Sequence, residues 1–501
     1  MTTAVKTPDA ADAALPAADE GFSKHVWLTA GVIVLGAIMS ILDMTVVSVA
    51  QQKFIDVFHS NQAQVAWTVT GYTLALAAVI PLTGWAADRF GTKRLYLIAI
   101  AAFAVGSALC AAATTLPMLV AFRVLQGLGG GMLMPLGMTI MTKAAGPDKV
   151  GRIMAVLGIP MMVGPIAGPI LGGWLIDAAS WQWIFLINIP VGIAAFVYSL
   201  AVLEKDDPKP SESFDFVGML LLSPGLATLL YGISSIPEKG TFFTPKVEIF
   251  TAIGAVLTIA FIPWALRKKN IHPLMDLRLF KNKEMTIAAV SMTLFMLAFM
   301  GASLLFPQYF QFVRHENSLH AGLMLAPQAV GSMLTMPIAG IISDKRGPGK
   351  VVLVGIVVTV AGLAMFSMLT DTTPYWYLLL ALFIMGLGMG STMMPIFSAA
   401  LATLRDATIA RGSTLTNIIQ QVAASIGTAI FAVVLTNGLR AKGLGQGMTP
   451  TGTNPLHDMA HAYSSTMWIA TILVALVFIP ALFLPRTKIE NPDAANIPMG
   501  H

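Results

Sequence analysis

The sequence predicts an all-α membrane protein in which two related bundles of six helices flank two inserted helices, giving fourteen transmembrane helices. Three observations support this fold class. Of the 501 residues, 56 % are hydrophobic and only 11 % are charged, whereas soluble proteins carry about 25 % charged residues. Long apolar runs recur along the chain, and one charged motif occurs twice. Such a chain cannot cover a water-facing surface with polar groups, so most of it is expected to lie in a bilayer.

The repeated motif is Gly84-Trp-Ala-Ala-Asp-Arg-Phe-Gly-Thr-Lys-Arg94, and it returns as Gly340-Ile-Ile-Ser-Asp-Lys-Arg-Gly-Pro-Gly-Lys350. In both copies an aspartate (Asp88 and Asp344) follows the first glycine by four residues, and a second glycine follows by seven. One charged turn at one place in each half of an apolar chain indicates duplication. Parallel repeats of this kind are one known plan of membrane transporters.

The transmembrane spans follow from the length of the apolar runs. A helix needs about 20 residues to cross the hydrocarbon core, and lipid tolerates only helices or closed barrels, of which runs this long favour helices. The expected spans are 26–50, 63–85, 94–113, 117–141, 150–176, 183–203, 215–236, 247–267, 284–308, 320–342, 351–370, 375–402, 411–437 and 462–485. The second charged motif follows the tenth span rather than the eighth, so the seventh and eighth are the inserted pair.

The domain organisation follows from these spans. Residues 26–203 should form the first bundle, 204–283 the linkers and the inserted helices, and 284–485 the second bundle. The first 25 residues are rich in Ala, Asp and Pro and lack the features of a signal peptide, so 1–25 is expected to be a disordered cytoplasmic tail, and 486–501 a second tail. The expected outer loop 438–461 is long and Gly-rich, as either a flexible loop or a lid would be.

Lys and Arg residues predict the orientation. With the N-terminus in the cytoplasm, the cytoplasmic segments contain 23 of the 30 basic residues and the outer loops contain 6, with Arg123 alone inside a span. Cytoplasmic loops of membrane proteins carry such an excess of basic residues. The bias predicts that both termini are cytoplasmic and that both charged motifs face the cytoplasm. It also explains the net charge of +5 without a nucleic-acid partner.

Two ionisable residues lie well inside apolar spans, Asp43 in the first and Arg123 in the fourth. A charge at this depth costs about 2.5–3.5 kcal/mol on insertion scales, so such residues usually face a cavity or a partner. Both belong to the outer half of the membrane and could approach each other. Burial favours the neutral form of Asp43 while a nearby Arg favours its ionised form, so a change of shape could load or release a proton. The alternative is a permanent structural ion pair.

The fifth span contains Gly164, Gly168 and Gly172, which lie on one face because they are four residues apart. A face without side chains lets another helix approach closely. Prolines at 160, 165 and 169 remove backbone donors and promote bending. The segment is therefore expected to be a tight helix–helix contact, a hinge or seal of the transport path, or both.

The remaining polar and aromatic residues within the spans are candidates for substrate binding or for packing: Trp67, Tyr72, Gln126, Gln308, Tyr309, Gln311, Asn417, Gln420 and Gln421. The single cysteine, Cys110, is interpreted as a core residue, and no Cys/His spacing indicates a metal site. The nucleotide-binding, zinc-protease and nucleophile-elbow motifs are missing from the sequence. We therefore expect no cofactor, no enzymatic activity and an ion gradient as the energy source.

These motifs together resemble the major facilitator superfamily, and within it the fourteen-helix drug:proton antiporters of the EmrB/QacA kind. The resemblance covers all fourteen spans. It is carried by the loop Gly84–Arg94, by the segment around Asp43, by Arg123 with Gln126-Gly127, by Gly164–Gly173, and by Trp181–Gly192. The chain departs from the pattern at Gln182 and Gln420, where an arginine is usual or frequent, and at Gly349 in the second loop.

The resemblance implies a monomeric, rocker-switch exporter in the bacterial cytoplasmic membrane. It makes Asp43 the proton site and Arg123 its modulator, and it places Asp88 against the N-terminus of span 411–437 to hold the cytoplasmic gate shut. The residues implied in gating are Gly84, Asp88, Arg89, Gly91, Arg94, Asp344, Gly164, Pro165, Gly168 and Gly172. The expected substrates are lipophilic compounds, with cations among them. The alternatives are export of a lipid or endogenous metabolite and, more remotely, a membrane sensor or enzyme.

Overall fold

The computed structural model describes residues 23–60, 62–146, 149, 152, 156, 158, 164, 167–168, 170–176, 178–205, 213–236, 243–270, 272–316, 318–402, 404, 408–444 and 454–487. Every element within these residues is helical, and 13 helices are long and apolar enough to cross a membrane. They correspond to thirteen of the fourteen predicted spans. The fifth, 150–176, falls largely outside the described residues, but its described positions, Gly164 and Gly168 among them, are helical. The predicted all-α membrane fold is confirmed.

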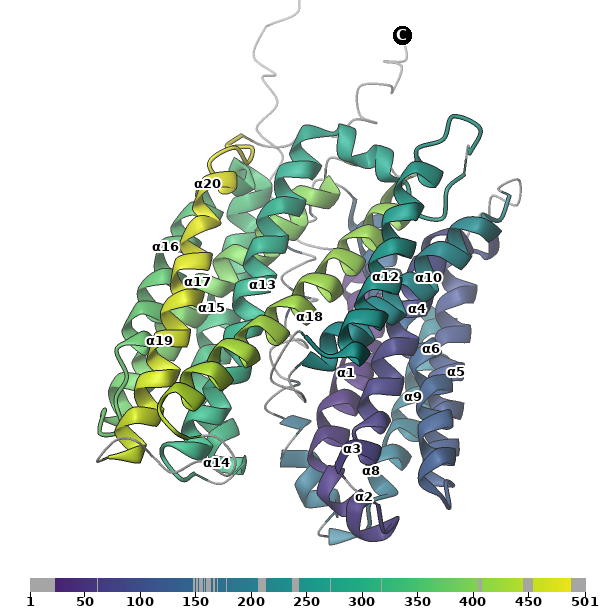
Figure 1. Cartoon of the computed structure of the whole chain (residues 1–501). Coiled ribbons are helices and arrows are strands. Elements are labelled where there is room, and N and C mark those ends of the chain that lie inside the picture. The colour runs from purple at the N-terminus through teal and green to yellow at the C-terminus, as the bar shows by residue number, and fades with distance from the viewer. Residues whose placement is uncertain are drawn as a thin grey trace, which may run out of the picture.

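The first half of the chain forms one bundle, coloured purple to blue in Figure 1. Its long helices are α1 (Lys24–Val49), α4 (Trp67–Phe90), α5 (Thr92–Ala111), α6 (Leu116–Ala145) and α9 (Asn188–Val202), the last preceded by α8 (Trp183–Leu186). These helices pack as neighbours, α4 and α5 against α6, and α1 against α6 and α9. Short helices α2 (Gln51–Val57) and α3 (Gln62–Val65) cap one end.

Glycines allow α6 to approach both neighbours in this bundle. A Cβ at Gly127 would lie 2.6 Å from the carbonyl oxygen of Tyr72 on α4, and one at Gly129 would lie 2.6 Å from the amide nitrogen of Phe103 on α5. The glycine-rich stretch that begins at Gly127 is therefore a packing surface between helices, as small residues in membrane helices commonly are.

The second half forms the other bundle, green to yellow in Figure 1. Its helices are α13 (Lys283–Phe312), α15 (Ala326–Arg346), α16 (Pro348–Ser367), α17 (Tyr375–Ala402), α18 (Ile409–Ala441) and α19 (Pro455–Leu476), with short α14 (Ser318–Leu323) and α20 (Phe478–Ala481). The predicted outer loop 438–461 is too long, because α18 runs to Ala441 and α19 begins at Pro455. Asn454 caps α19 by accepting a hydrogen bond from the His457 amide, so His457 and His461 are helical.

The inserted pair, α10 (Phe216–Ser234) and α12 (Pro245–Ala265), is followed by the short 3₁₀ helix η2 (Leu277–Lys281). The carboxylate of Asp215 joins the beginning of this hairpin to its end. Its Oδ1 accepts hydrogen bonds from the Gly218 amide (2.8 Å) and the Trp264 indole (2.8 Å), and its Oδ2 accepts one from the Leu274 amide (3.1 Å). The buried carboxylate therefore fixes the two helices as one unit.

The hairpin packs mainly on α4 and also reaches α18 of the other half. Aromatic pairs hold it to α4 at both ends, Trp67 with Tyr231 (ring centroids 5.3 Å apart) and Trp85 with Phe214 (4.5 Å). Against α18 it contributes to an apolar cluster formed by Ile233, Ile236, Val247, Ala429 and Val433. The insert thus covers one flank of the contact between the halves (Figure 1).

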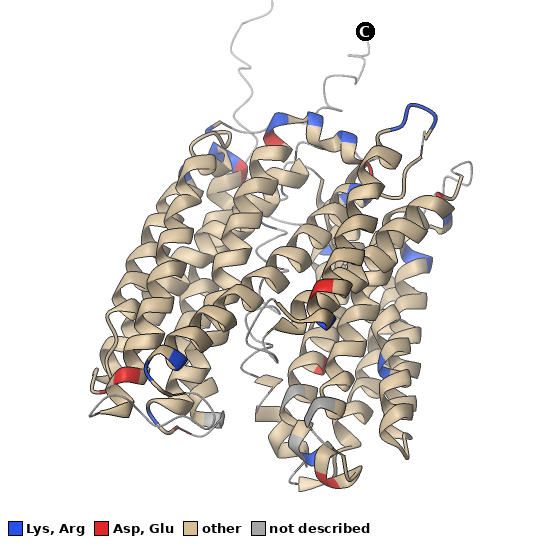
Figure 2. Ribbon diagram, in the orientation of Figure 1, with Lys and Arg blue, Asp and Glu red and all other residues tan. Residues whose placement is uncertain are grey.

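Both ends of the described chain, the beginning of α1 and the end of α20, lie at the same end of the molecule (Figure 1). Lys and Arg residues gather at that end (Figure 2). The two charged turns are built alike there. Gly91 after α4 and Gly347 after α15 have φ of 91° and 83°. Glycine adopts these angles at little cost, which explains why both copies of the motif carry glycine seven residues after the first.

Candidate functional site

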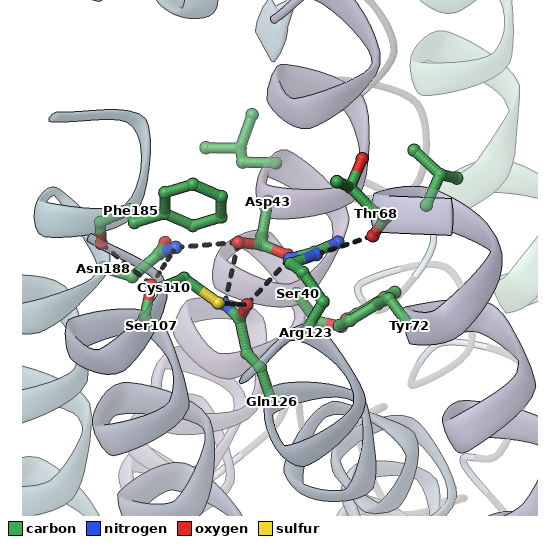
Figure 3. A network of polar contacts seen from close by, with 12 residues as sticks. Ser40, Asp43, Thr68, Tyr72, Ser107, Cys110, Arg123, Gln126, Phe185 and Asn188 are labelled. Carbon is green, nitrogen blue, oxygen red and sulfur yellow. Dashed lines mark hydrogen bonds and ion pairs between the residues drawn. The ribbon is translucent and has the colours of Figure 1, made fainter. Parts of the chain in front are cut away.

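A buried ion pair lies inside the first bundle (Figure 3). Nη1 of Arg123 on α6 is 2.5 Å from Oδ2 of Asp43 on α1, and both side chains are fully buried. Neither helix could keep its charge at this depth alone, because burying an unpaired ion costs several kcal/mol. The structure brings together the two intramembrane charges that the sequence singled out.

Two amides complete the surroundings of the carboxylate. Oδ1 of Asp43 accepts hydrogen bonds from Nε2 of Gln126 (2.8 Å) and from Nδ2 of Asn188 (3.1 Å). Gln126 Oε1 in turn accepts from Arg123 (2.7 Å), and Asn188 also donates to Ser107 (3.1 Å). Each of the three groups that contact the carboxylate is a donor, so this arrangement suits the ionised form of Asp43.

The guanidinium of Arg123 is held on its other sides by α4 and α8. Its Nε donates to the Thr68 carbonyl (3.0 Å), and its central carbon lies 4.1 Å from the centre of the Tyr72 ring and 5.8 Å from that of Phe185. Cation–π contacts of this kind add stabilisation where the cation is desolvated. Nη2 of Arg123 is buried and has no hydrogen-bond partner among the described residues. The pair is therefore enclosed by residues of five helices of one bundle, α1, α4, α6, α8 and α9.

The glycines of the fifth span contact the same helix that carries Asp43. A Cβ at Gly164 would lie 2.1 Å from Cγ2 of Ile41, and one at Gly168 would lie 2.0 Å from Oγ1 of Thr45. The Thr45 hydroxyl donates to the Gly164 carbonyl (3.3 Å). Ile41 and Thr45 flank Asp43 by two residues on either side, so the fifth span and the ion pair share one stretch of α1. Pro165 lies outside the described residues.

The aspartates of the two charged turns both reach across to the opposite half. Asp88, near the end of α4, pairs with Arg411 in the first turn of α18 (3.4 Å). Asp344, near the end of α15, pairs with Arg152 in the fifth span through Nε (3.7 Å) and also accepts its backbone amide (3.2 Å). The duplicated motif thus makes two crosswise contacts at one end of the molecule.

Close backbone approach accompanies the first of these contacts. A Cβ at Gly84 would lie 3.1 Å from Oγ1 of Thr414 and 3.5 Å from both the Ala410 carbonyl and the Arg411 Cα. Any larger side chain at this position would push α4 from α18. The remaining residues implied in gating, Arg89, Gly91 and Arg94, lie in or beside the same turn.

The residues considered for substrate binding do not form one site and lie in five different settings. Tyr72 and Gln126 belong to the buried ion-pair network, and Trp67 faces the inserted hairpin. Tyr309 is fully buried inside the second bundle, where its hydroxyl donates to the Thr370 carbonyl (2.6 Å). Asn417 donates to the sulfur of Met138 on α6 (3.2 Å), across the two halves. The half-buried glutamines among the candidates are Gln308, Gln311, Gln420 and Gln421.

Sequence reasoning missed four residues that complete these sites. Asn188 and Ser107 join the carboxylate network, and Arg411 and Arg152 are the partners of the two motif aspartates. Asn188 carried a signal, since an amide near the start of an apolar span needs a partner. The sequence also carries a signal for Arg411 and Arg152. Each is a basic residue at the start of a predicted span, at the same end as the acidic residues of the charged turns.

A polar cluster lies at the opposite end of the second bundle. The Tyr375 hydroxyl donates to Oε1 of Glu316 (2.6 Å), His320 lies 3.2 Å from Oε2, and Arg314 stacks over the Tyr375 ring at 4.5 Å. The hydrogen bond from Tyr375 holds the pKa of the Glu316 carboxyl below its usual range, helped by His320 and Arg314. His457 lies 3.0 Å from Asp371 in the same region. These contacts join α14, α17 and α19 within one bundle.

Comparison with known proteins places this arrangement in a family. The family model described as Major Facilitator Superfamily matches residues 33–428. The multidrug resistance protein B homolog of Mycobacterium tuberculosis H37Rv is 48 % identical over 93 % of this chain and 91 % of its own. The multidrug export protein EmrB of Escherichia coli K12 is 30 % identical over 86 % and 84 %.

Solved structures show the same fold at low sequence identity. The human organic anion transporter MFSD10 superposes with a TM-score of 0.61 over 90 % of this chain and 99 % of its own, at 14 % identity. A double tryptophan mutant of XylE superposes with a TM-score of 0.62 over 94 % and 98 %, at 16 % identity. These likenesses concern the architecture of two helical bundles.

Proposed function

The chain belongs to the major facilitator superfamily, and on that basis we propose that it is a proton-coupled exporter of lipophilic compounds, cations among them. The names of its bacterial relatives, multidrug resistance protein B homolog and multidrug export protein EmrB, support drugs as the substrate class. The cytoplasmic membrane is its proposed location, with both termini in the cytoplasm. The excess of basic residues at the end of the molecule that carries both chain ends supports this orientation.

The observation that carries the proposal is the fully buried pair of Asp43 and Arg123. In the described conformation Asp43 is surrounded by donors, an arrangement that suits a carboxylate. Protonation would remove its charge and leave Arg123 buried without a counter-charge, at a cost on the order of several kcal/mol. Movement that hydrates Arg123 would remove this cost. Loading and release of one proton are thereby tied to two different arrangements of the first bundle.

The fifth span links the proposed proton site at Asp43 to the proposed gate contact at Asp344, so movement at one could be transmitted to the other. Its glycine face lies on α1 beside Asp43, and its beginning holds Arg152 against Asp344 of the second half. A shift of α1 that follows protonation would move the fifth span and weaken this contact. In the proposed cycle both motif aspartates release their arginines together, and the two bundles rock to open the cytoplasmic side.

Substrate and proton compete in this scheme. The first bundle holds one buried carboxylate among the described membrane helices, so a cation that approaches Asp43 would favour loss of its proton. We assign the half-buried glutamines of the second bundle, Gln420 and Gln421 on α18 and Gln308 and Gln311 on α13, to the substrate path as polar contacts within an apolar surface. The transporter is proposed to act as a monomer.

The test is proton flux in liposomes that contain the purified protein under an imposed pH gradient. A lumenal pH dye would follow the response to tetraphenylphosphonium for the wild type, Asp43→Asn and Asp56→Asn. Asp56 is an exposed residue of α2, so its variant makes the same chemical change away from the network. We expect cation-triggered proton flux in the wild type and in Asp56→Asn, and none in Asp43→Asn.

Each other outcome has a definite meaning. Flux that survives in Asp43→Asn would move the proton site elsewhere and leave the ion pair as a structural element. Cation transport without proton flux in the wild type would contradict coupling while preserving export. Absence of both would refute drug export and leave a lipid or metabolite as the cargo.

A further inference from the structure

Two cavities meet at the basic end of the first bundle, between α5 and the end of α9. One is an open groove of about 550 Å³ along the exposed side of α5, lined by Arg94, Leu97, Ile98, Ala101 and Phe196. The other is a smaller recess of about 320 Å³ with polar walls, lined by His25, Thr29, Lys143 and Glu204. Lys93 and Lys205 line both cavities, so the groove and the recess are continuous at these two side chains.

The recess has an excess of positive charge. Three lysines, Lys93, Lys143 and Lys205, face one carboxylate, Glu204, which lies 3.4 Å from the His25 ring. Lys93 also donates to the carbonyls of Leu200 (2.9 Å) and Leu203 (2.5 Å) at the end of α9, which fixes its ammonium group between the two cavities. An anion in the recess would therefore meet a charge held in place rather than a mobile surface lysine.

A buried hydroxyl adds a second polar feature to the recess. Oγ1 of Thr29 is buried, its residue is 1 % exposed, and it has no hydrogen-bond partner among the described residues. A hydroxyl in such a place normally has a partner, since burying one without a hydrogen bond is unfavourable. A ligand oxygen within the recess would provide that partner.

The groove differs in character. Ile98 is 53 % exposed and faces outward from the bundle, as do the lipid-facing residues along the same side of α5. A hydrocarbon chain lying there would cover apolar surface on α5 and α9, while its polar end would reach Lys93 and Lys205. The combined shape is that of an amphiphile with an anionic head and an apolar tail.

We propose that an anionic phospholipid of the adjacent leaflet binds here, with its phosphate in the recess and one acyl chain in the groove. Juxtamembrane basic residues attract anionic lipids by about 1 kcal/mol each, so the lysines favour phosphatidylglycerol over a zwitterionic lipid. Free phosphate would share the recess but gain nothing from the groove. The site is separate from the Asp43 network and from the gate contacts of Asp88 and Asp344.

Native mass spectrometry of the purified full-length protein tests this site by counting bound lipid. Phosphatidylglycerol and phosphatidylcholine with identical acyl chains would be compared for the wild type, for Lys143→Gln with Lys205→Gln, and for Lys281→Gln with Lys283→Gln. The last pair removes the same charge from exposed positions at the same end of the molecule, away from both cavities. We expect a preference for phosphatidylglycerol that falls about 25-fold only in the first double variant, because two lysines are removed.

A third variant, Ala101→Phe, fills the groove and leaves the charges unchanged. It should weaken binding of long-chain phosphatidylglycerol more than binding of its six-carbon analogue. The proposal would be overturned if the control double variant lost the preference for phosphatidylglycerol to the same extent. It would also be overturned if the wild type bound phosphatidylcholine equally well, or if Ala101→Phe did not change lipid binding. Displacement of the lipid by sn-glycerol 3-phosphate at the same concentration would identify a free-anion site instead.

Discussion

Asp43 on α1 and Arg123 on α6 form an ion pair 2.5 Å long in which neither side chain is exposed. The pair is closed on one side by amide groups and on the other by aromatic rings. In this conformation each charge stabilises the other, so a substitution that removes one of them leaves the other buried without a counter-charge.

The first prediction concerns the stability of this pair. Arg123→Met should destabilise the protein by about 3–5 kcal/mol, because it leaves a buried carboxylate without its counter-charge. The double variant Asp43→Leu with Arg123→Met should regain most of that stability, while cation-driven proton flux stays absent in both. Thermal unfolding in detergent, followed by the fluorescence of the nine tryptophans, would measure this. Equal unfolding temperatures of the single and double variants would show that the charges do not depend on each other.

The second prediction concerns the contact between Asp88 and Arg411. Asp88→Asn should weaken the closed state by about 1 kcal/mol, the upper value for a partly exposed pair, and so open the gate about fivefold more often. A cysteine at position 414 reports this, because Thr414 is 1 % exposed beside Gly84 and the native Cys110 is fully buried. Its labelling rate by a membrane-impermeant maleimide should rise accordingly.

Charge exchange provides the control for that experiment. Asp88→Arg combined with Arg411→Asp should restore slow labelling, since each new charge also suits the helix terminus on which it would lie. Fast labelling in the exchanged variant would mean that the contact is steric and that the charges contribute nothing to closure.

The third prediction concerns the glycine face of the fifth span. Gly164→Ala should abolish export and cost about 1–3 kcal/mol in stability, because its Cβ would overlap Cγ2 of Ile41 at 2.1 Å. Gly173→Ala is the matched control, since no atom of another described segment lies within 4 Å of a Cβ at that position. Adding Ile41→Ala removes the clashing atom and leaves the next contact at 3.2 Å, so partial recovery of export is expected. An inactive Gly173→Ala would imply that helix propensity, not packing, decides the outcome.

The fourth prediction concerns pH at the end of the second bundle opposite the charged turns. Because the hydrogen bond from Tyr375 lowers the pKa of Glu316, its stabilisation is present above the ordinary carboxyl pKa and is lost as pH falls through the lowered one. Tyr375→Phe should therefore lower the unfolding temperature at pH 7, and the difference from wild type should disappear in acid. Tyr377→Phe, two residues away, should show no such dependence. A difference that persists unchanged at pH 3 would assign the effect to packing of the ring.

The sequence predicted the helices well because hydropathy over twenty residues is a strong signal, and it singled out Asp43 and Arg123 because charges are rare in such runs. It could not predict that the partner of Asn188 is Asp43, since which helices touch α1 is a property of tertiary packing. It also left Asp344 without a partner, because Arg152 lies 192 residues away and no spacing rule joins them. Trp67 shows the same limit, as only the rotation of α4 decides that its ring faces the insert.

The hairpin of α10 and α12 has a mechanical consequence. Aromatic contacts at both ends bind it to α4, whereas its contact with α18 includes a cluster of aliphatic side chains, Ile233 and Val433 among them. Aliphatic surfaces can slide past each other without breaking directional bonds. The hairpin should therefore move with the first bundle as one rigid body, while α18 of the second bundle slides along its apolar surface. The hairpin would then block solutes that diffuse within the bilayer from reaching the contact between the two bundles on that side, whichever conformation the protein adopts.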